Sequence, residues 1–565
     1  MKFLKYPFLM VASLFQQSKR FVSAQQTSIL SAAVIIMSLS VVSALLGLLR
    51  YRLLDSFFGT PTLRLQADAF LVAFQIPDLL FQLLVAGVLS ATFIPVYSRV
   101  LHKSEEESHV FVSALMILLA VCYVLIAIIA GIFAPEIIRS MTGAKYTLAQ
   151  VDLSVQLMRI MLVSTFFLLL SNFFSGILQS SKRFILPSLS PVVYNLGNII
   201  GIVFLSRWFG IYGAAIGVVI GAFVHFVIQL PDAFKLGFRF RFSWPILRPD
   251  VLEVIRLMVP RGATLATNNF EDFVGLFVVT SLGSTFVLLY SAAQSLAAAP
   301  IRFFGVSIAQ AALPFFTSKA KDGDMKGLTS LLTETLHQIA FFMYPAGALL
   351  LVLRVPIVRL AMGAKQLPWS DTVTMGQLVA IYALSIAALA MTNVVLRAYF
   401  AIKETRLPFL FACISMTINV VVMWLAAFVF KWGIISVAIG PTTAAICEFL
   451  LQLIFFFRKV HSFSSHEFFI PQGKMVLATA IMGVALYIPM KLLDQLVFDT
   501  TRVVGLIALT LVVSLVGMVV YLVLCWLLHI EQLSIVTSLP GKIKGWQAKL
   551  SKTTEVLAVE EETTL

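Results

Sequence analysis

Residues 110–133 read VFVSALMILLAVCYVLIAIIAGIF, a stretch without a single charged side chain. A helix needs about 20 predominantly apolar residues to cross the hydrocarbon core of a bilayer, so this stretch predicts a membrane-spanning helix. Similar runs recur along all 565 residues, of which 60% are hydrophobic and only 12% are charged. The mean hydropathy of +0.97 agrees with this. The composition excludes a soluble globular protein and predicts an all-α polytopic membrane protein.

The chain contains fourteen candidate spans, which we place near 28–49, 68–93, 110–133, 153–178, 185–205, 210–231, 251–282, 285–316, 331–353, 371–400, 408–430, 433–457, 473–495 and 503–528. An even number of spans puts both termini on one side of the membrane. That side carries 24 of the Lys and Arg residues and the opposite side carries 12. Because cytoplasmic loops carry the excess, we expect both termini in the cytoplasm. The same asymmetry explains the net charge of +14 without a nucleic-acid partner.

Three landmarks recur in the same order and at a nearly constant spacing, which indicates an internal duplication. The pairs are Ile94-Pro95 with Leu313-Pro314, Leu186-Pro187 with Leu407-Pro408, and Gly210-Ile211 with Gly433-Ile434. Six spans per copy is an even number, so both copies run in the same direction. We therefore expect two parallel six-helix lobes around a central cavity, plus two extra helices. The predicted divisions are a cytoplasmic segment (1–26), an N-lobe (27–245), a C-lobe (246–460), the extra helices (461–529) and a cytoplasmic tail (530–565).

Ionisable side chains inside a span are costly and are candidates for function. The expected seventh span carries a polar cluster about one helical turn long, formed by Asn268, Asn269, Glu271 and Asp272. This cluster predicts a cation site. The alternative is that one carboxylate pairs with Arg261 or Arg302 and only stabilises the lobe.

Arg302 follows Pro300 by two positions in the expected eighth span. A proline-broken helix would direct the guanidinium into the cavity, where it would bind an anion bidentately. The alternative is that its long side chain reaches the membrane interface. Gly213, Gly217 and Gly221 form a small-residue stripe that predicts close packing of two helices and no chemistry.

The sequence holds no phosphate-binding loop, no nucleophile elbow and no zinc-ligand spacing. We therefore expect no catalytic residues, no metal centre and no cofactor. The expected activity is transport and not enzymatic catalysis.

Several blocks resemble one family of transporters, and they are Asp68-Ala69-Phe70, Pro77-Asp78-Leu79, Phe93-Ile94-Pro95, Gly176-Ile177-Leu178-Gln179 and Arg397-Ala398-Tyr399-Phe400-Ala401. Together they resemble the MurJ (MviN) family of lipid II flippases, within the MATE-like multidrug, oligosaccharidyl-lipid and polysaccharide exporter superfamily. The resemblance runs from about the first to the twelfth span. It implies a protein of the bacterial cytoplasmic membrane that moves an undecaprenyl-pyrophosphate-linked peptidoglycan precursor from the inner to the outer leaflet.

The same resemblance implies a cationic cavity, because a pyrophosphate needs paired cations and arginine binds phosphate oxygens bidentately. Arg50, Asp68 and Arg397 match functional positions of the family. Arg261 and Arg302 are candidates to replace arginines that are missing here. The expected substrate cavity therefore comprises Arg50, Asp68, Arg261, Arg302 and Arg397.

Four positions depart from the family pattern. The first-span pattern Ser-Arg-x-Leu-Gly-x-x-Arg keeps only its last arginine, Arg50. The second-span arginine position holds Phe81 or Gln82, and the acidic position before Gly87 holds Ala86. In the eighth span an expected arginine is Ser295.

Family members are described with a sodium site between helices 7, 11 and 12. Asn419 matches its helix-11 position, whereas Met423 stands one turn later where another ligand is expected. The cluster from Asn268 to Asp272 is a candidate to compensate, and Na⁺ or H⁺ is the candidate coupling ion.

Two further functions stay open. One is a cation-coupled small-molecule exporter of the MATE type. The other is a transport-inactive membrane scaffold for cell-wall enzymes. The expected partners are a lipid-linked cell-wall precursor, membrane lipid and cell-wall synthesis proteins, with no nucleic acid.

Overall fold

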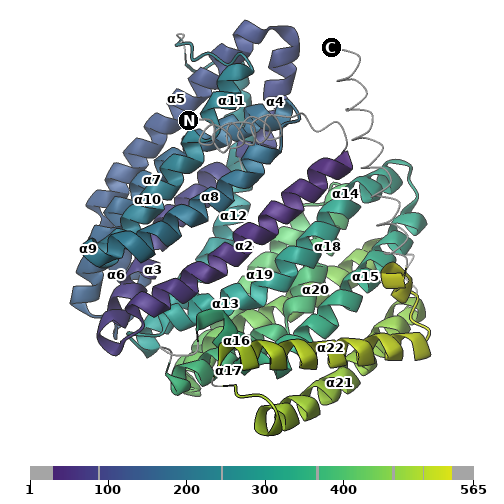
Figure 1. Cartoon of the computed structure of the whole chain (residues 1–565). Coiled ribbons are helices and arrows are strands. Elements are labelled where there is room, and N and C mark those ends of the chain that lie inside the picture. The colour runs from purple at the N-terminus through teal and green to yellow at the C-terminus, as the bar shows by residue number, and fades with distance from the viewer. Residues whose placement is uncertain are drawn as a thin grey trace, which may run out of the picture. The chain divides into compact units, whose positions relative to one another are not determined.

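The computed structural model describes residues 29–86, 89–242, 246–363, 368–460, 465–500 and 502–537. All regular elements in these ranges are helices (Figure 1). Within these helices, the side chains of residues 29–35, 61, 85–86, 89–92, 95, 257 and 259–269 lie outside the description. The predicted N-terminal segment and most of the predicted tail also lie outside it.

Thirteen helical segments of the described chain are long and apolar enough to cross a membrane. They coincide with thirteen of the fourteen predicted spans. The other predicted span, 251–282, corresponds to helix α12 (Pro249–Leu282). The predicted all-helical, polytopic fold is therefore confirmed.

The helices fall into two compact units, each made of three separate stretches of chain. Unit 1 combines residues up to Ala299 with Val358–Tyr382 and Phe409–Ala444. Its elements are α2 (Ile29–Phe58), α3 (Pro61–Phe81), η1 (Gln82–Ala86), α4 (Leu89–Lys103), α5 (Glu105–Ile132), α6 (Ala134–Met141), α7 (Leu148–Ser180), α8 (Ile185–Ile200), η2 (Gly201–Leu205), α9 (Ser206–Phe209), α10 (Ile211–Val227), α11 (Leu230–Lys235), α12, most of α13 (Val287–Pro300), α17 (Trp369–Ala383), α19 (Arg406–Trp424), η4 (Leu425–Val429) and η5 (Gly433–Ile435).

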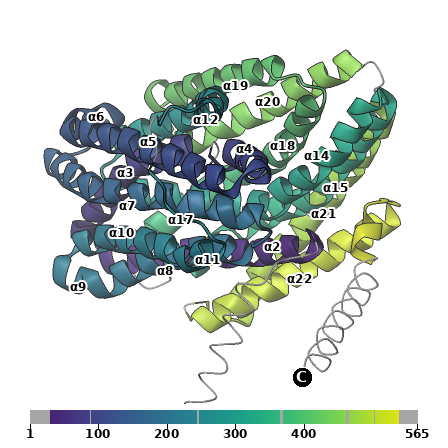
Figure 2. The same ribbon diagram turned by 90° about the horizontal axis from the view of Figure 1, so that it is seen from above.

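Aromatic rings hold part of the core of unit 1 together. The Phe93 ring stacks on Phe111 at 6.0 Å and meets Phe173 edge-on at 5.6 Å, measured between ring centroids. All three rings are fully buried. The three rings belong to α4, α5 and α7, which contact one another, and Figure 2 shows α5 and α7 side by side. Such aromatic pairs contribute about 0.5–1.5 kcal/mol each beyond their buried area.

Unit 2 contains η3 (Ile301–Gly305), α14 (Val306–Lys321), α15 (Met325–Val352), α18 (Ile386–Ala401), α21 (Ser465–Leu496) and α22 (Val503–Leu527). Among the described helices, α16 (Arg354–Met362) and α20 (Ser436–Val460) are divided between the units, and α13, α17 and α19 each have one to three terminal residues in unit 2. The two predicted extra helices, α21 and α22, run next to each other (Figure 1). Tyr521 of α22 donates a hydrogen bond to the Phe341 carbonyl of α15 at 3.0 Å. Tyr344 of α15 donates to Gln472 of α21 at 2.6 Å.

The predicted glycine stripe lies where α10 approaches α8 and η2 of unit 1 closely. A Cβ atom on Gly217 of α10 would lie 2.5 Å from the Cα atom of Gly201 in η2. A Cβ atom on Gly221 would lie 2.6 Å from the Tyr194 carbonyl oxygen of α8. Only glycine permits backbones this close, which confirms the packing role predicted for the stripe.

Local backbone features recur at the spacing predicted for the duplication. Among the π-helical turns in the described residues, η3 follows η1, and η4 follows η2, by nearly the same interval that separates the landmark pairs. Each π turn accommodates one extra residue in a helix and locally re-aims the side chains. The turns at Gly210 and Gly433, with φ of 55° and 65°, also correspond. The two copies therefore share irregular backbone geometry as well as landmark residues.

Candidate functional site

Arg50 lies near the C-terminal part of α2 and stacks on aromatic rings. Its guanidinium carbon is 5.2 Å from the ring centre of Tyr51 and 5.7 Å from that of Phe74 on α3. Among the described residues it makes no hydrogen bond or ion pair. Asp78 of α3 interacts with its charge and accepts a hydrogen bond from Gln82 at 2.8 Å. The guanidinium of Arg50 therefore makes cation–π contacts with two rings, one from its own helix and one from α3.

Asp68 of α3 is fully buried and caps another helix. Its carboxylate accepts the backbone N–H of Val287 at 3.3 Å and that of Leu288 at 2.8 Å. These are the first two residues of α13, whose N–H groups have no partner within their own helix. Asp68 thus joins a helix of the first repeat to one of the second, because a carboxylate is favourable at a helix N-terminus.

Two of the predicted cavity arginines belong to unit 2. Arg302 is exposed on the π turn η3, which directly follows Pro300. The expected break in the helix is therefore wrong, because the helix continues from α13 through this wider π turn into α14. Arg397 of α18 is partly buried, and its Nε atom has no hydrogen-bond partner among the described residues. The side chain of Arg261 lies outside the described residues.

The predicted cation cluster is described only in part. The side chains of Asn268 and Asn269 lie outside the description. Asp272 of α12 accepts a hydrogen bond from Gln294 of α13 at 3.3 Å. The charges of Asp272 and Glu271 both act on Tyr290, and that of Asp272 also acts on Tyr382. The two carboxylates therefore lie in a polar environment shared by α12, α13 and α17.

Asn419 contacts a different helix. It is 1% exposed, and its Oδ1 atom has no hydrogen-bond partner among the described residues. A Cβ atom on Gly440 of α20 would lie 2.7 Å from this oxygen, so α20 and α19 approach closely here. Met423 is buried one turn later. In the described part of the chain, no group of three or more His, Cys, Asp or Glu side chains is placed to hold a metal ion.

One charged cluster was not predicted from the sequence. Arg64 of α3 donates a hydrogen bond to Asp371 of α17 and lies 3.5 Å from Asp55 of α2. Nearby, Arg52 donates to the Leu360 carbonyl at 3.4 Å. Asp371 is 307 residues from Arg64 in the sequence, so no local motif indicates the pairing.

A charged contact outside the spans stabilises a loop of unit 2. Lys459 of α20 donates to Glu404, whose carboxylate also accepts the backbone N–H of Arg406 at 3.0 Å. The hydrogen bond from Lys459 is the main cause that lowers the pKa of Glu404 below its usual value. The loop between α18 and α19 is thereby tied to α20.

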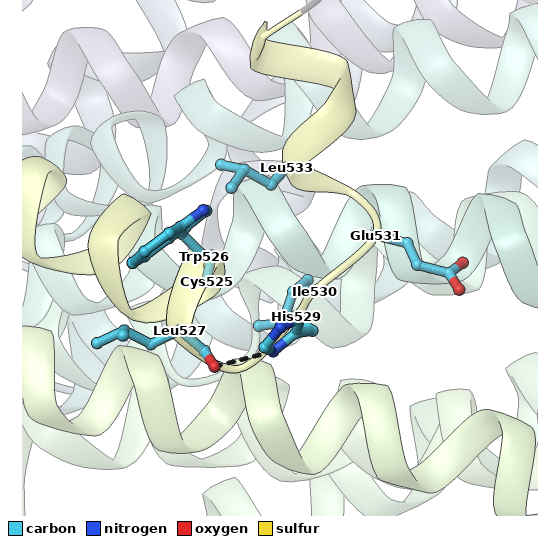
Figure 3. Close-up of a pocket in the computed structure, with 7 residues that line it drawn as sticks. All are labelled: Cys525, Trp526, Leu527, His529, Ile530, Glu531 and Leu533. Carbon is cyan, nitrogen blue, oxygen red and sulfur yellow. Dashed lines mark hydrogen bonds between the residues drawn. The ribbon is translucent and has the colours of Figure 1, made fainter.

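Figure 3 shows a surface pocket at the C-terminal end of α22, lined by Cys525, Trp526, Leu527, His529, Ile530, Glu531 and Leu533. His529 has a φ of 53° and its Nδ1 atom lies 3.1 Å from the Leu527 carbonyl oxygen. None of the predicted site residues lines this pocket.

The apolar helices, the buried charges at helix ends and the duplicated backbone define a multi-pass membrane transporter of the helical class. The chain belongs to the MurJ family, because the family model described as "Lipid II flippase MurJ" matches residues 55–504.

Individual relatives match over most of both chains. A probable lipid II flippase MurJ of Bdellovibrio bacteriovorus is 25% identical over 518 residues, which cover 90% of this chain and 96% of the relative. The lipid II flippase MurJ of Thermosipho africanus is 26% identical over 461 residues, covering 82% and 91%.

Solved structures share the fold. A lipid II flippase MurJ in an inward closed conformation superposes with a TM-score of 0.73 at 25% identity, covering 88% of this chain and 99% of that one. An inward-facing multidrug resistance transporter of the MATE family gives a TM-score of 0.60 at 15% identity, covering 76% and 98%. The second likeness concerns the fold alone.

Proposed function

We propose that this protein flips a lipid-linked peptidoglycan precursor, lipid II, from the inner to the outer leaflet of the bacterial cytoplasmic membrane by alternating access. The observation that carries the proposal is the family match over residues 55–504. The matched relatives from Bdellovibrio and Thermosipho carry this activity in their names. Both termini face the cytoplasm, as the distribution of Lys and Arg favours.

The chemistry of the substrate gives roles to two arginines. A pyrophosphate in a low-dielectric cavity needs charge-assisted hydrogen bonds. Arg50 is held by ring faces and makes no ion pair among the described residues, while the Nε atom of Arg397 lacks a partner there. Both guanidinium groups are therefore suited to receive phosphate oxygens. Asp68 has a positioning role, because it fixes the start of α13.

The second candidate function is a cation-coupled small-molecule exporter of the MATE type. The partly buried carboxylate of Asp272, which accepts a hydrogen bond from Gln294, favours it, because an ionisable group inside a span is a candidate site for Na⁺ or H⁺. In either case Na⁺ or H⁺ is the proposed coupling ion. Membrane lipid surrounds the protein, and cell-wall synthesis proteins are the proposed partners of its basic cytoplasmic loops.

The test replaces an essential lipid II flippase with this gene in a depletion strain and measures labelled lipid II in the outer leaflet. We expect the chain to restore flipping. Arg397→Ala should lower the rate by about 10- to 100-fold, the equivalent of one charge-assisted hydrogen bond of roughly 1.5–3 kcal/mol. Arg502→Ala is the matched control, because Arg502 is 83% exposed and pairs only with its neighbour Asp499 among the described residues.

A chain that is inserted in the membrane yet restores no flipping contradicts the proposal. Vesicles containing the purified protein then separate the alternatives. Substrate efflux driven by a Na⁺ or H⁺ gradient would establish the exporter. No transport under any gradient, together with co-purification of cell-wall enzymes, would establish the scaffold.

A further inference from the structure

Three charged side chains meet where α2 ends and where α3 and α17 begin, and none belongs to the sites considered above. We call them the Asp55–Arg64–Asp371 triad. Arg64 uses Nη1 to donate to Asp371, while its Nη2 atom is 3.5 Å from Oδ1 of Asp55. The side chains of Asp55 and Arg64 are 0% and 6% exposed, whereas Asp371 is 19% exposed. One guanidinium is therefore shared unequally between a buried carboxylate and one that reaches the surface.

The charges of the triad do not balance. Two carboxylates and one guanidinium carry a net charge of −1 when all are ionised. Oδ2 of Asp55 is buried without a hydrogen-bond partner among the described residues, and so is Nε of Arg64. Asp55 is therefore the carboxylate that lacks a neutralising cation, because Arg64 makes its closer contact with Asp371.

The neighbouring helices supply no further cation to Asp55 in the described part of the chain. The charges that act on it are Arg64 from α3 and Asp371 from α17. Asp68, about one turn after Arg64 on α3, is a second buried carboxylate, and it interacts with both Arg64 and Asp371. Arg52, on the same helix as Asp55, donates to the Leu360 carbonyl instead.

An ionised carboxylate that is buried without full compensation is strongly unfavourable, and a bound proton removes the cost. We propose that Asp55 is a proton-binding site, and that Arg64 changes partner from Asp371 to Asp55 when this end of the protein opens. The inference rests on the proposed function, because alternating access requires such an opening. In the closed arrangement Arg64 neutralises Asp371 and a proton neutralises Asp55.

Opening separates Asp371 from Arg64 and exposes it to water. Arg64 then pairs with Asp55, whose carboxyl group gives its proton to water and becomes a carboxylate. Closing reverses both steps, so one proton is released on opening and bound on closing. The ratio of open to closed protein should therefore rise about tenfold per pH unit, as one linked proton requires.

The experiment measures this ratio in the full chain in lipid nanodiscs without any precursor. Spin labels on Thr62→Cys and Trp369→Cys, in a background with the four native cysteines changed to serine, report the distance between the starts of α3 and α17. Both positions are exposed. We expect the ratio of the long-distance to the short-distance population of the otherwise unchanged chain to grow about tenfold per pH unit between about pH 4 and 6, and to level off above this range.

Two variants test the proton site and the partner exchange of Arg64, and a third is their control. Asp55→Asn imitates the protonated carboxyl group, so the ratio should become independent of pH and favour the closed distance. Asp371→Asn should also remove the pH dependence but favour the open distance. Asp152→Asn, at an exposed position of α7, is the matched control and should keep the slope.

If the ratio of open to closed protein does not depend on pH in the chain without these substitutions, the inference is wrong. It is also wrong if Asp55→Asn keeps the full tenfold change per pH unit. If Asp55→Asn fails to fold, the infrared band of a buried protonated carboxyl group decides. It should be present before substitution and lost in Asp371→Asn, and its persistence there contradicts the partner exchange. The nanodisc experiment uses no precursor, so the two proposals can fail separately. A pH-dependent ratio in a chain that restores no flipping would contradict only the proposed flippase function. Flipping by a chain whose ratio does not depend on pH would contradict only the proton site.

Discussion

Replacing Gly217 with alanine tests the close approach of α10 to η2. The added Cβ atom would lie 2.5 Å from the Cα atom of Gly201 and 3.0 Å from the Gly197 carbonyl oxygen. Carbon atoms pack favourably at about 3.5–4.0 Å, so the backbones must separate by roughly 1 Å. Both obstacles are backbone atoms, so no side-chain rotation can relieve the contact.

The expected cost follows from this displacement. Overpacking of a well-packed interior costs about 1–3 kcal/mol. Alanine also favours a helix over glycine by about 0.8–1.0 kcal/mol, which partly masks the cost. Gly483→Ala provides the matched control, because Gly483 lies within α21 and a Cβ atom there meets nothing within 4 Å. The difference between the two variants should therefore equal the packing cost alone, about 1–3 kcal/mol.

The measurement is the free energy of unfolding of the purified full chain during titration with denaturing detergent in mixed micelles. We expect Gly483→Ala to be neutral or slightly stabilising and Gly217→Ala to be less stable than the control. Equal stability of the two variants would refute the backbone contact between α10 and η2. Gly217→Ser, which adds one more atom, should be at least as destabilising as Gly217→Ala.

Two further predictions concern charged groups. Asp68→Ala leaves two N–H groups of α13 without their acceptor, at about 1–3 kcal/mol each, so flipping in the depletion strain should fall at least tenfold while insertion is retained; unchanged flipping would contradict the capping role. Asp68→Asn keeps one acceptor oxygen and should give an intermediate rate. Glu404→Gln should lower stability most above the carboxyl pKa of the unfolded chain, about 4.3, because Lys459 lowers the folded pKa of Glu404. Below about 4.3 the contribution of Glu404 declines, and it is lost as pH falls through the folded pKa. Unfolding midpoints measured from pH 3 to 7 should converge at low pH, and a constant difference would contradict this account.

The helices could be predicted because their cause is local. A run such as residues 110–133 has no stable arrangement in water, and its length matches a bilayer. Proline and glycine landmarks revealed the duplication for a similar reason, since each constrains its own turn. The stripe of Gly213, Gly217 and Gly221 indicated a close approach without indicating its partner. The partner, Gly201, became known only from the structure.

The contacts of the site could not be predicted, because they join residues that are distant in sequence. Asp68 was predicted as a cavity residue, yet its partners are backbone N–H groups about 220 residues away, which no side-chain pattern encodes. Asp55, Arg64 and Asp371 lie near helix ends, where charged residues are usually solvated. Nothing in the sequence therefore separates them from ordinary loop charges. The expectation of a broken helix at Pro300 was wrong because the chain continues directly from Pro300 into the π turn η3.

Aligning the two repeats shows which residue of the first copy corresponds to Arg302. The second-span arginine position of the family holds Phe81 or Gln82 here, and Gln82 begins the π turn η1. When the two copies are aligned on these turns, Gln82 corresponds to Ile301, which begins η3, and Arg302 corresponds to Leu83. The chain thus lacks a cation beside one π turn and carries one beside the equivalent turn of the other repeat. Because η1 and η3 occupy equivalent positions in the two copies, we propose that Arg302 replaces the arginine that is missing at η1.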